Sequence, residues 1–289
     1  MFDFSVLSET VKYQAMIELP EALVLSQEIN DALSGKTIRN VIAGKSPHKF
    51  AWFHEDPKAY NDRLAGKTIR SAKHQGGMVE VSIDDIFLVF SEGIRLKYFH
   101  PGEITPDKHQ LFVEFSDESS LVATVQMYGG LVAFKEGEMT NKYYLGAREK
   151  PSPFSDRFDS AYFDQLFSSS PDNISLKAFL ATEQRIPGLG NGVLQDILFN
   201  TNLHPKKKIN TLKDKDKEEI FLTVKSTLTK MADQGGRDTE QDIFGVSGGY
   251  HCILCKNTVD HPCPKCGTTI KKMAYMGGSV YVCEKCQKI

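Results

Sequence analysis

Residues 263–286 read CPKCGTTIKKMAYMGGSVYVCEKC, and their two Cys-x-x-Cys pairs are separated by 16 residues. Each pair can supply two thiolates from one tight turn, and a hairpin between the pairs brings all four together, as a tetrahedral zinc site requires. A hairpin this small buries too little apolar surface to fold alone, so we expect the metal to supply its folding free energy. The spacing therefore predicts one structural Zn²⁺ ion with four ligands, Cys263, Cys266, Cys283 and Cys286. The alternative is four reduced surface thiols without metal.

The composition indicates an ordinary globular protein. At 289 residues, with 40% hydrophobic and 25% charged residues, the chain is long enough for two domains and a small module. No apolar run approaches the roughly 18 residues of a membrane span, and residues 1–15 lack the basic start and apolar core of a signal peptide. The six cysteines all lie within 252–289, which favours metal binding in a reducing cytosol over disulfides. We therefore expect a cytoplasmic protein without a membrane anchor.

Charge is divided unevenly along the chain. The net charge of −2 argues mildly against binding to nucleic acid. Residues 205–289, however, carry 15 basic and 10 acidic side chains, whereas residues 1–204 carry 20 and 27. Because phosphate binding depends on local positive charge, a basic C-terminal part on an acidic body is compatible with DNA. Ordinary surface variation is the alternative.

An amphipathic helix opens the predicted fold. Apolar residues in 19–33 recur at helical spacing, and Gly35 is a natural stop. Strand-like segments follow, interrupted by a short helical stretch near 57–65. The predicted strands are 37–44, 48–54, 68–72, 78–83, 85–90, 111–115, 120–128 and 131–137. This pattern predicts a β-sandwich with one leading helix.

Helical patterning replaces the strands after a loop rich in Pro, Ser and Asp at 150–160. We expect helices at 175–185, from Asn191 to the residues before His204, and at 211–233. A glycine-rich, mobile loop at 234–250 and the zinc hairpin, with its turn at Met276-Gly277-Gly278, complete an α+β fold. The predicted domains are an extension at 1–15, a β-sandwich at 16–150, a helical domain at 151–245 and a zinc-finger hairpin at 246–289.

A second motif joins two of the predicted helices through Pro187-Gly188-Leu189-Gly190-Asn191. Such a turn presents backbone N–H groups and a helix N-terminus, which together favour an anion. Asn191 at the start of the second helix can cap it and donate to a phosphate. The alternative is a plain helical hairpin, but the zinc hairpin further along the chain favours DNA binding.

These motifs together resemble the formamidopyrimidine-DNA glycosylase / endonuclease VIII family. Residues 16–22, MIELPEA, are similar to the family's MPELPE start, and residues 188–191 match the GxGN turn of its helix–two-turn–helix motif. The family's QGG segment is matched at 234–236, and the CQK end of its zinc hairpin is matched through Gln287 and Lys288. Lys108 and His109 match the Lys-His pair that precedes a central strand in the family. The resemblance runs in order from residue 16 to residue 289.

The resemblance implies base-excision repair of damaged or abasic double-stranded DNA by a monomer with one zinc ion, acting on nucleoid DNA in a bacterial cytoplasm. Family members flip an oxidised base out of the duplex, cleave its glycosidic bond and cut the abasic strand by β/δ-elimination. Their nucleophile is the N-terminal amine of a proline, which forms a Schiff base with C1′ of the sugar. By resemblance, Glu18 handles protons and Glu21 positions the amine and the sugar. The alternative for both is a first-turn acid that interacts with the helix dipole.

The resemblance also implies DNA contacts. His109, Lys177 and Asn191 match family positions that grip phosphate. The arginine at the tip of the family's zinc hairpin falls at Gly278, and we expect Lys271 and Lys272 on the hairpin to replace it in part. Solubilising lysines are the alternative. A family lysine also falls at Gly76, and the arginine–phenylalanine wedge falls within 128–130. Each loss removes a contact worth about 1–3 kcal/mol.

The nucleophile position departs most from the family, because Ile17 replaces the proline and 15 residues precede Met16. A peptide nitrogen is an amide without useful basicity and cannot form a Schiff base. We therefore expect the working chain to start at Met16, with residues 1–15 a tag or a misassigned start. Bulky Ile17 disfavours removal of Met16, whose primary amine would then act from one residue outside the usual place.

Two other functions remain open. A catalytically inactive binder of damaged DNA or unusual DNA structures would explain Ile17, Gly76 and Gly278, and a zinc-containing protein-interaction module would explain the acidic body. A separate question concerns the third Cys-x-x-Cys pair, Cys252 and Cys255, which could form a second zinc site with nearby histidines. Four better-spaced ligands already exist, so free thiols are the favoured interpretation.

Overall fold

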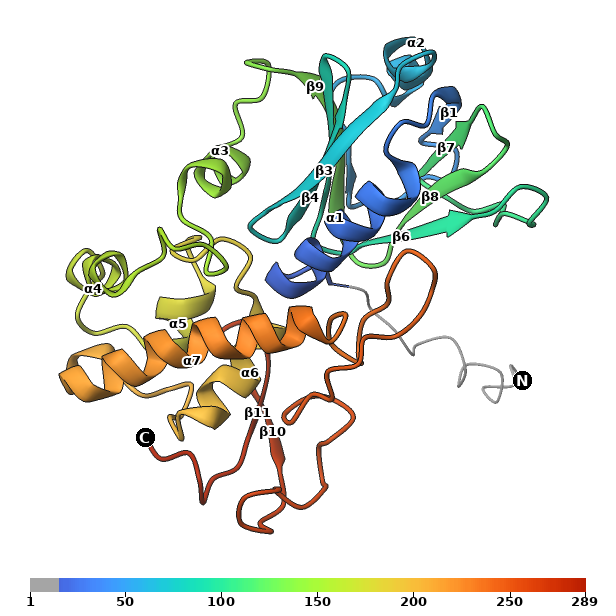
Figure 1. Cartoon of the computed structure of the whole chain (residues 1–289). Helices are drawn as coiled ribbons and strands as arrows, with labels where there is room; N and C mark the ends of the chain where they lie inside the picture. Colours follow the sequence, from blue (N-terminus) through green and yellow to red (C-terminus); the bar gives the residue numbers. More distant parts are fainter. Residues whose placement is uncertain (1–15) are drawn as a thin grey trace.

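The computed structural model describes residues 16–289 and shows a β-sandwich beside a helical part that ends in a β-hairpin (Figure 1). One sheet runs in the order β1 (Ile38–Ala43), β7 (Leu111–Phe115), β8 (Ser120–Val125) and β6 (Ile94–Phe99). The other runs in the order β2 (Ala51–Trp52), β9 (Gly129–Lys135), β5 (Ile86–Ser91), β4 (Met78–Ile83) and β3 (Ile69–Gln75). All neighbouring strands are antiparallel except β2 and β9. The predicted α+β class with a sandwich is confirmed.

The leading helix α1 (Leu19–Leu33) has the predicted bounds and packs against β3 and β4. Its buried face places Leu25, Ile29 and Leu33 in the sandwich core. Each such side chain contributes about 1.5–3 kcal/mol when it leaves water. The start of the helix joins the two parts of the molecule, because Leu19 lies in the core of the helical part and Ile17 in that of the sandwich.

Strand β6 was not predicted, although its sequence has the expected period of two. Ile94 and Leu96 are buried, whereas Arg95 and Lys97 point away from the core. The strand follows β5 after only Glu92 and Gly93, and so short a turn is easily mistaken for the end of the apolar run. All the strands that were predicted are present, with bounds shifted by up to three residues.

The helical part contains α4 (Ser160–Ser168), α5 (Leu176–Ala181), α6 (Asn191–Asn200) and α7 (Asp214–Asp233), and α3 (Lys142–Glu149) precedes them. Shorter elements are η2 (Pro57–Ala59), α2 (Tyr60–Leu64) and η3 (Ile209–Thr211). Sequence analysis missed α3 and α4, whose N-caps Asn141 and Asp159 accept hydrogen bonds from helical N–H groups. Helix α5 ends earlier than predicted, because Thr182 is extended and Glu183 has a positive φ. Among residues 16–289, no helix has both the length and the apolar character of a membrane span.

The hairpin of β10 (Lys271–Tyr275) and β11 (Gly278–Val282) confirms the predicted strand pair and its turn. Met276 and Gly277 both have positive φ, at 50° and 72°, as a tight two-residue hairpin turn demands. Val280 and Val282 are buried, and Ile270 and Cys283 belong to a small core that includes Phe199 from α6. The hairpin is thereby attached to the helical part by packing as well as by its cysteines.

The glycine-rich segment 234–250 returns from α7 to the sandwich and is held there by specific contacts. Ile243 is fully buried in the sandwich core, and its carbonyl accepts from the Tyr98 N–H at 2.7 Å. Its own N–H donates to Glu28 at 3.2 Å. A mobile loop was predicted from the glycines alone. The structure instead gives a segment that links the two parts, because one apolar side chain finds a place in a distant core.

Candidate active-site cleft and four-cysteine centre

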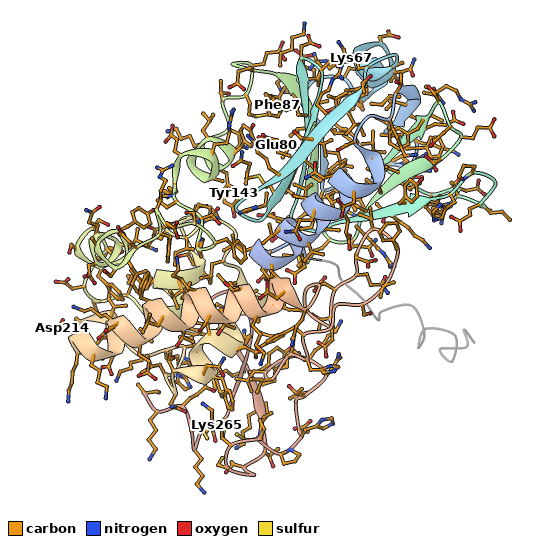
Figure 2. The ribbon with its side chains drawn as sticks, in the orientation of Figure 1. Lys67, Glu80, Phe87, Tyr143, Asp214 and Lys265 are labelled. Carbon is orange, nitrogen blue, oxygen red and sulfur yellow. The ribbon has the colours of Figure 1, made fainter. Side chains whose placement is uncertain are left out.

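A cleft of about 610 Å³ lies where the sandwich, the helical part and the hairpin turn meet. Met16 and Glu18 line it from the start of α1, Lys177 and Asn191 from α5 and α6, and Gly278 from the hairpin. Tyr143 on α3 also lines the cleft, on the side of the sandwich that faces the helical part (Figure 2). Two of the three predicted catalytic residues and two of the five predicted DNA-binding residues therefore line one opening.

Glu18 caps helix α6 from outside the helix. Its carboxylate accepts from the backbone N–H groups of Gly192 and Val193, each at 2.8 Å. The sequence predicted that Asn191 caps this helix. In the structure it does not, because Gly190 occupies the N-cap position. The anion expected at this helix N-terminus is thus the protein's own carboxylate. Burial raises the pKa of Glu18, although Arg237 and the two N–H groups oppose that change.

Arg237 binds both glutamates at the start of α1. Its Nε and Nη2 donate to the two carboxylate oxygens of Glu21 at 2.8 Å each, and its Nη1 lies 3.7 Å from Glu18 Oε2. Although burial lowers it, the two glutamates hold the pKa of Arg237 well above its ordinary value. A side chain at Gly192 would meet this guanidinium, since a Cβ there would lie 1.7 Å from Nη1. Sequence analysis did not identify Arg237, although it directly follows the recognised QGG segment.

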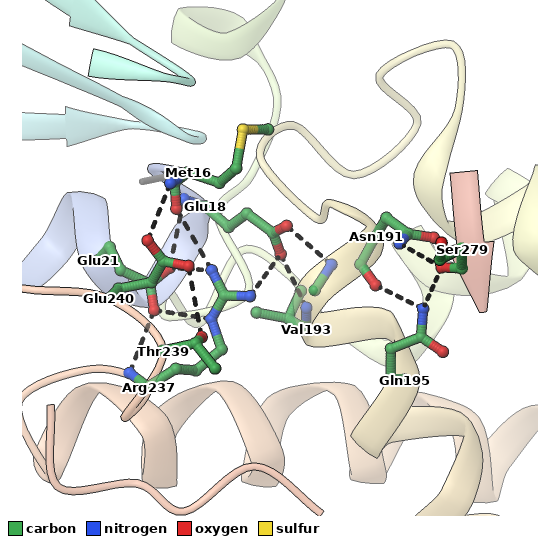
Figure 3. Close-up of polar contacts among 11 residues, drawn as sticks. Met16, Glu18, Glu21, Asn191, Val193, Gln195, Arg237, Thr239, Glu240 and Ser279 are labelled. Atoms are coloured by element: carbon green, nitrogen blue, oxygen red, sulfur yellow. Dashed lines mark hydrogen bonds and ion pairs between the residues drawn. The ribbon is translucent and has the colours of Figure 1, made fainter. Parts of the chain in front are cut away.

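A third glutamate reaches the same point from the loop after Arg237. The backbone nitrogen of Met16 donates to Glu240 Oε2 at 2.9 Å (Figure 3), and the Thr239 hydroxyl donates to Oε1 at 3.3 Å. The Met16 carbonyl accepts from Arg237 Nη2 at 3.3 Å. Burial raises the pKa of Glu240 to about 7, and the nearby guanidinium limits the rise. Glu240 is the second site residue that sequence analysis missed.

Two of the predicted DNA-binding residues fasten the hairpin turn to the helices. Lys177 is 4% exposed and donates to the Tyr275 carbonyl at 2.7 Å. Asn191 donates through Nδ2 to the Ser279 carbonyl at 2.9 Å, while its buried Oδ1 has no partner in the described part of the chain. Burial lowers the pKa of Lys177. These two contacts join α5 and α6 to the hairpin at the cleft, and we call them the polar seam.

The other three predicted DNA-binding residues are not among those that line the cleft. His109 is 4% exposed within the sandwich, with Nδ1 3.0 Å from the Pro106 carbonyl and Nε2 without a partner among residues 16–289. Lys271 and Lys272 are exposed on β10, and Lys271 pairs with Glu284 at 3.3 Å. Glu21, by contrast, lies directly behind the cleft wall through its pairing with Arg237.

The β3–β4 turn presses against the turn before α6. A Cβ on Gly76 would lie 2.7 Å from Cβ of Pro187, and one on Gly188 would lie 2.0 Å from the Gly77 nitrogen. Gly76 also has a φ of +57°, which favours glycine. A lysine at position 76 would therefore not fit without moving this contact, so the change from the family pattern is built into the packing.

The four-cysteine centre has the geometry of a metal site. The sulfur atoms of Cys263, Cys266, Cys283 and Cys286 all lie within 4.8 Å of one another. The distance is 3.8 Å between Cys263 and Cys286 and 3.4 Å between Cys266 and Cys283. Tetrahedral thiolates about 2.3 Å from a zinc ion would be close to such separations. Cys252 and Cys255 are free thiols that line the cleft and do not belong to this group.

Comparisons with known proteins identify the same architecture along almost the whole chain. Residues 150–242 match the model of the formamidopyrimidine-DNA glycosylase H2TH domain. The formamidopyrimidine-DNA glycosylase of Bacillus licheniformis is 30% identical over 280 residues, covering 94% of this chain and 100% of that protein. The Bacillus subtilis protein of the same name is 29% identical over 285 residues, covering 94% and 99%.

Solved structures share the fold. The Lactococcus lactis Fpg, in a complex with DNA that contains N7-benzyl-Fapy-dG, superposes with a TM-score of 0.80 at 21% identity, covering 94% of this chain and 100% of that one. The MutM (Fpg) protein of Thermus thermophilus gives a TM-score of 0.77 at 20% identity, covering 93% and 98%. The agreement extends through the sandwich, the helical part and the C-terminal hairpin.

Proposed function

The chain belongs to the formamidopyrimidine-DNA glycosylase family, because it covers the full length of a 30% identical member, and from this premise we propose that it binds damaged double-stranded DNA, excises oxidised bases and cleaves abasic sites. The observation that carries the proposal is the cleft, which is lined by Met16 and Glu18 and also by Lys177 and Asn191. One opening then holds the groups for chemistry together with the groups for phosphate. We place the protein on nucleoid DNA in a bacterial cytoplasm, as a monomer.

In this proposal the α-amine of Met16 attacks C1′ of the flipped nucleotide and forms a Schiff base. Glu18 moves protons at the sugar, and Glu21 orients the amine through Arg237, which contacts both the Glu21 carboxylate and the Met16 carbonyl. The chemistry requires a chain that starts at Met16, since an amide nitrogen cannot act as an amine. The predicted extension, residues 1–15, lies outside the described residues.

We propose that Lys177, Asn191, His109, Lys271 and Lys272 contact the DNA backbone. Lys177 and Asn191 already line the cleft, the second N–H of Asn191 Nδ2 can donate to a phosphate oxygen, and Nε2 of His109 has no partner among residues 16–289. Contact through His109 requires the surrounding loop to move, because that nitrogen is buried. Lys271 and Lys272 would approach phosphate from the outer face of the hairpin, where both are exposed.

We propose that the four cysteines hold one Zn²⁺ ion, whose contribution is to fix the hairpin by thiolate ligation. With the hairpin fixed, the Tyr275 and Ser279 carbonyls stay within reach of Lys177 and Asn191. Metal binding at one end of the hairpin thus supports the polar seam at the other end. The two thiols outside the cluster, Cys252 and Cys255, take no part in this proposal.

A catalytically inactive binder of damaged DNA is the second candidate. It is favoured by Ile17 at the nucleophile position and by Gly76, where the packing leaves no room for a lysine. Both candidates predict salt-dependent binding to DNA, which a protein-interaction module would lack.

Borohydride trapping on a duplex with one abasic site separates the candidates. We would compare the 1–289 chain with a Met16-start version, residues 16–289, which keeps every described element. Trapping by the Met16-start version alone is the expected result. Retained affinity without trapping by either would establish the inactive binder. Trapping by both would exclude Met16 as the nucleophile and indicate an internal lysine.

A further inference from the structure

One loop holds both backbone polar atoms of Met16. Glu240 Oε2 accepts from the Met16 nitrogen at 2.9 Å, and Arg237 donates to the Met16 carbonyl at 3.3 Å. The loop is itself anchored, because Tyr250 N–H donates to the Gly236 carbonyl at 3.0 Å and Asp238 N–H to the Tyr250 carbonyl at 2.8 Å. Figure 3 shows Glu240 and Glu21 on the same side of Met16, with Arg237 below them. The position of the Met16 nitrogen is therefore set by side chains more than 200 residues away.

The charges around that nitrogen do not balance. Glu18, Glu21 and Glu240 bring three carboxylates, and within residues 16–289 the cationic side chain that pairs with them is Arg237. Glu21 takes the Nε–Nη2 edge of the guanidinium and Nη1 lies next to Glu18, which leaves Glu240 with only the Met16 N–H and a hydroxyl. Even a partly buried carboxylate without a cationic partner of its own is costly. A positive charge at the Met16 nitrogen is the missing element, and an α-ammonium would supply it.

We propose that Glu240 binds the α-ammonium of Met16 and accepts its proton when the amine adds to the sugar. The inference rests on the proposed function, since the amine must be the nucleophile. A carboxylate 2.9 Å from the nitrogen is within the reach that a general base requires. Glu240 is then a catalytic residue of this chain, supplied by the loop that follows the QGG segment.

The proton balance of the step is complete with these groups. The ammonium passes one proton to Glu240, and the free amine forms a bond to the aldehyde C1′ of the abasic sugar while the carbonyl π electrons move to oxygen. A second proton moves from nitrogen to that oxygen. Glu240 then returns its proton to the resulting hydroxyl, which leaves as water, and a protonated Schiff base remains. No further oxidant, reductant or co-reactant is needed.

Several charged or titratable groups face Glu240 and set its behaviour with pH. Arg237 lies on its own loop, Glu18 and Glu21 lie at the start of α1, and Arg95 from β6 lines the small pocket beside it. Burial raises the pKa of Glu240 to about 7 with an uncharged nitrogen opposite. An ammonium there lowers the pKa of Glu240, and the carboxylate in turn raises that of the amine above its ordinary value of about 7.7–8.0.

The test uses Glu240→Gln in the Met16-start version. Glutamine keeps an oxygen acceptor for the nitrogen and removes only the charge and the basicity. Glu219→Gln is the matched control, since Glu219 is an exposed side chain on α7. The pH dependence of Met16 acetylation by acetic anhydride, read by mass spectrometry of the N-terminal peptide, gives the pKa of the amine without any need for activity. We expect that pKa to fall by about one unit in Glu240→Gln and to stay unchanged in the control.

Trapping on the abasic duplex supplies the second readout. Loss of a general base costs about 10²–10⁴-fold, and the lower amine pKa restores about tenfold at pH 7, so we expect a net fall of at least about tenfold. The remaining trapping should follow the titration of the amine alone. Equal amine pKa values in wild type and Glu240→Gln would overturn the contact, and equal trapping rates would overturn the proton transfer. No trapping by the wild-type Met16-start version overturns the proposed chemistry, while the acetylation profile still decides whether Glu240 holds the amine.

Discussion

The two clusters of ionisable groups in this molecule are built in opposite ways. The four-cysteine centre draws all its ligands from residues 263–286, and its sulfurs lie within 4.8 Å of one another. The carboxylate cluster brings Met16 and Glu21 together with Arg237 and Glu240, across 216 to 224 residues of sequence. In our proposals a metal completes the first cluster, whereas the second already contains one cation, Arg237, and needs another at the Met16 nitrogen. The local cluster can direct folding, but the long-range cluster exists only after the fold has formed.

Loss of the metal should have the largest effect. Structural zinc contributes about 10–16 kcal/mol of binding free energy to small sites of this kind, so Cys283→Ser should release the ion and unfold the hairpin. Zinc content per chain and amide-exchange protection of residues 271–282 are the measurements. Cys252→Ser is the control, because that thiol lies outside the cluster. A metal-free wild type with a fully protected hairpin would show that packing against Phe199 is sufficient.

Arg237→Met should be the most damaging change in the other cluster. It leaves Glu18 and Glu21 buried with no cationic partner among residues 16–289, which typically costs about 3–5 kcal/mol. Urea unfolding at pH 7 measures the loss. Arg39→Met is the matched control, since Arg39 pairs with Glu114 at the surface and such pairs are worth about 0–1 kcal/mol. Equal losses in the two variants would mean that the buried cluster is neutralised by protonation instead.

The same contrast explains what the sequence could and could not predict. The leading helix, most strands and the cysteine hairpin follow from local spacing, and the structure contains them. The sequence assigned the cap of α6 to Asn191, at the start of that helix. The structure uses Glu18 instead, which lies 174 residues away from its partner Gly192. Arg237 and Glu240 carry no local pattern that marks them as site residues. Only the fold brings them to Met16.

Gly192→Ala should break the long-range cluster without changing any of its charges. The added Cβ would lie 1.7 Å from Arg237 Nη1 and 2.9 Å from Glu18 Oε1, so the guanidinium has to move. Overpacking of this kind typically costs about 1–3 kcal/mol. Gly146→Ala on α3 is the matched control, because nothing lies within 4 Å of its added Cβ and alanine favours a helix by about 0.5–1 kcal/mol. Thermal melts of the two variants should therefore shift in opposite directions.

The smallest expected effect is a difference in pH-dependent stability between the 1–289 chain and the Met16-start version. In the 1–289 chain the Met16 nitrogen is a neutral amide, and burial raises the pKa of Glu240 from 4.5 to about 7. The folded state then binds more protons than the unfolded state between those values, so stability falls as pH rises through that window and stays low above it. Glu240→Gln removes this fall. We expect the variant of the 1–289 chain to be as stable as wild type at pH 4 and more stable by about 1 kcal/mol at pH 8. This is less than the free energy that corresponds to the whole pKa shift, because the Glu240 side chain is partly exposed.

In the Met16-start version the sign should reverse. The α-ammonium pairs with Glu240, so the carboxylate is stabilised in the folded state and its replacement by glutamine removes a favourable contact. Urea unfolding of both versions at pH 8, each with and without Glu240→Gln, forms a double cycle. The two versions differ in residues 1–15 and in the charge on the Met16 nitrogen, and the cycle isolates the part of that difference to which Glu240 responds. A cycle that closes to zero would mean that Glu240 does not sense that charge, and the cluster would then be complete with Arg237 alone. A cycle that leaves a coupling of about 1 kcal/mol or more would show that the carboxylate cluster, like the cysteine centre, needs a cation to be complete.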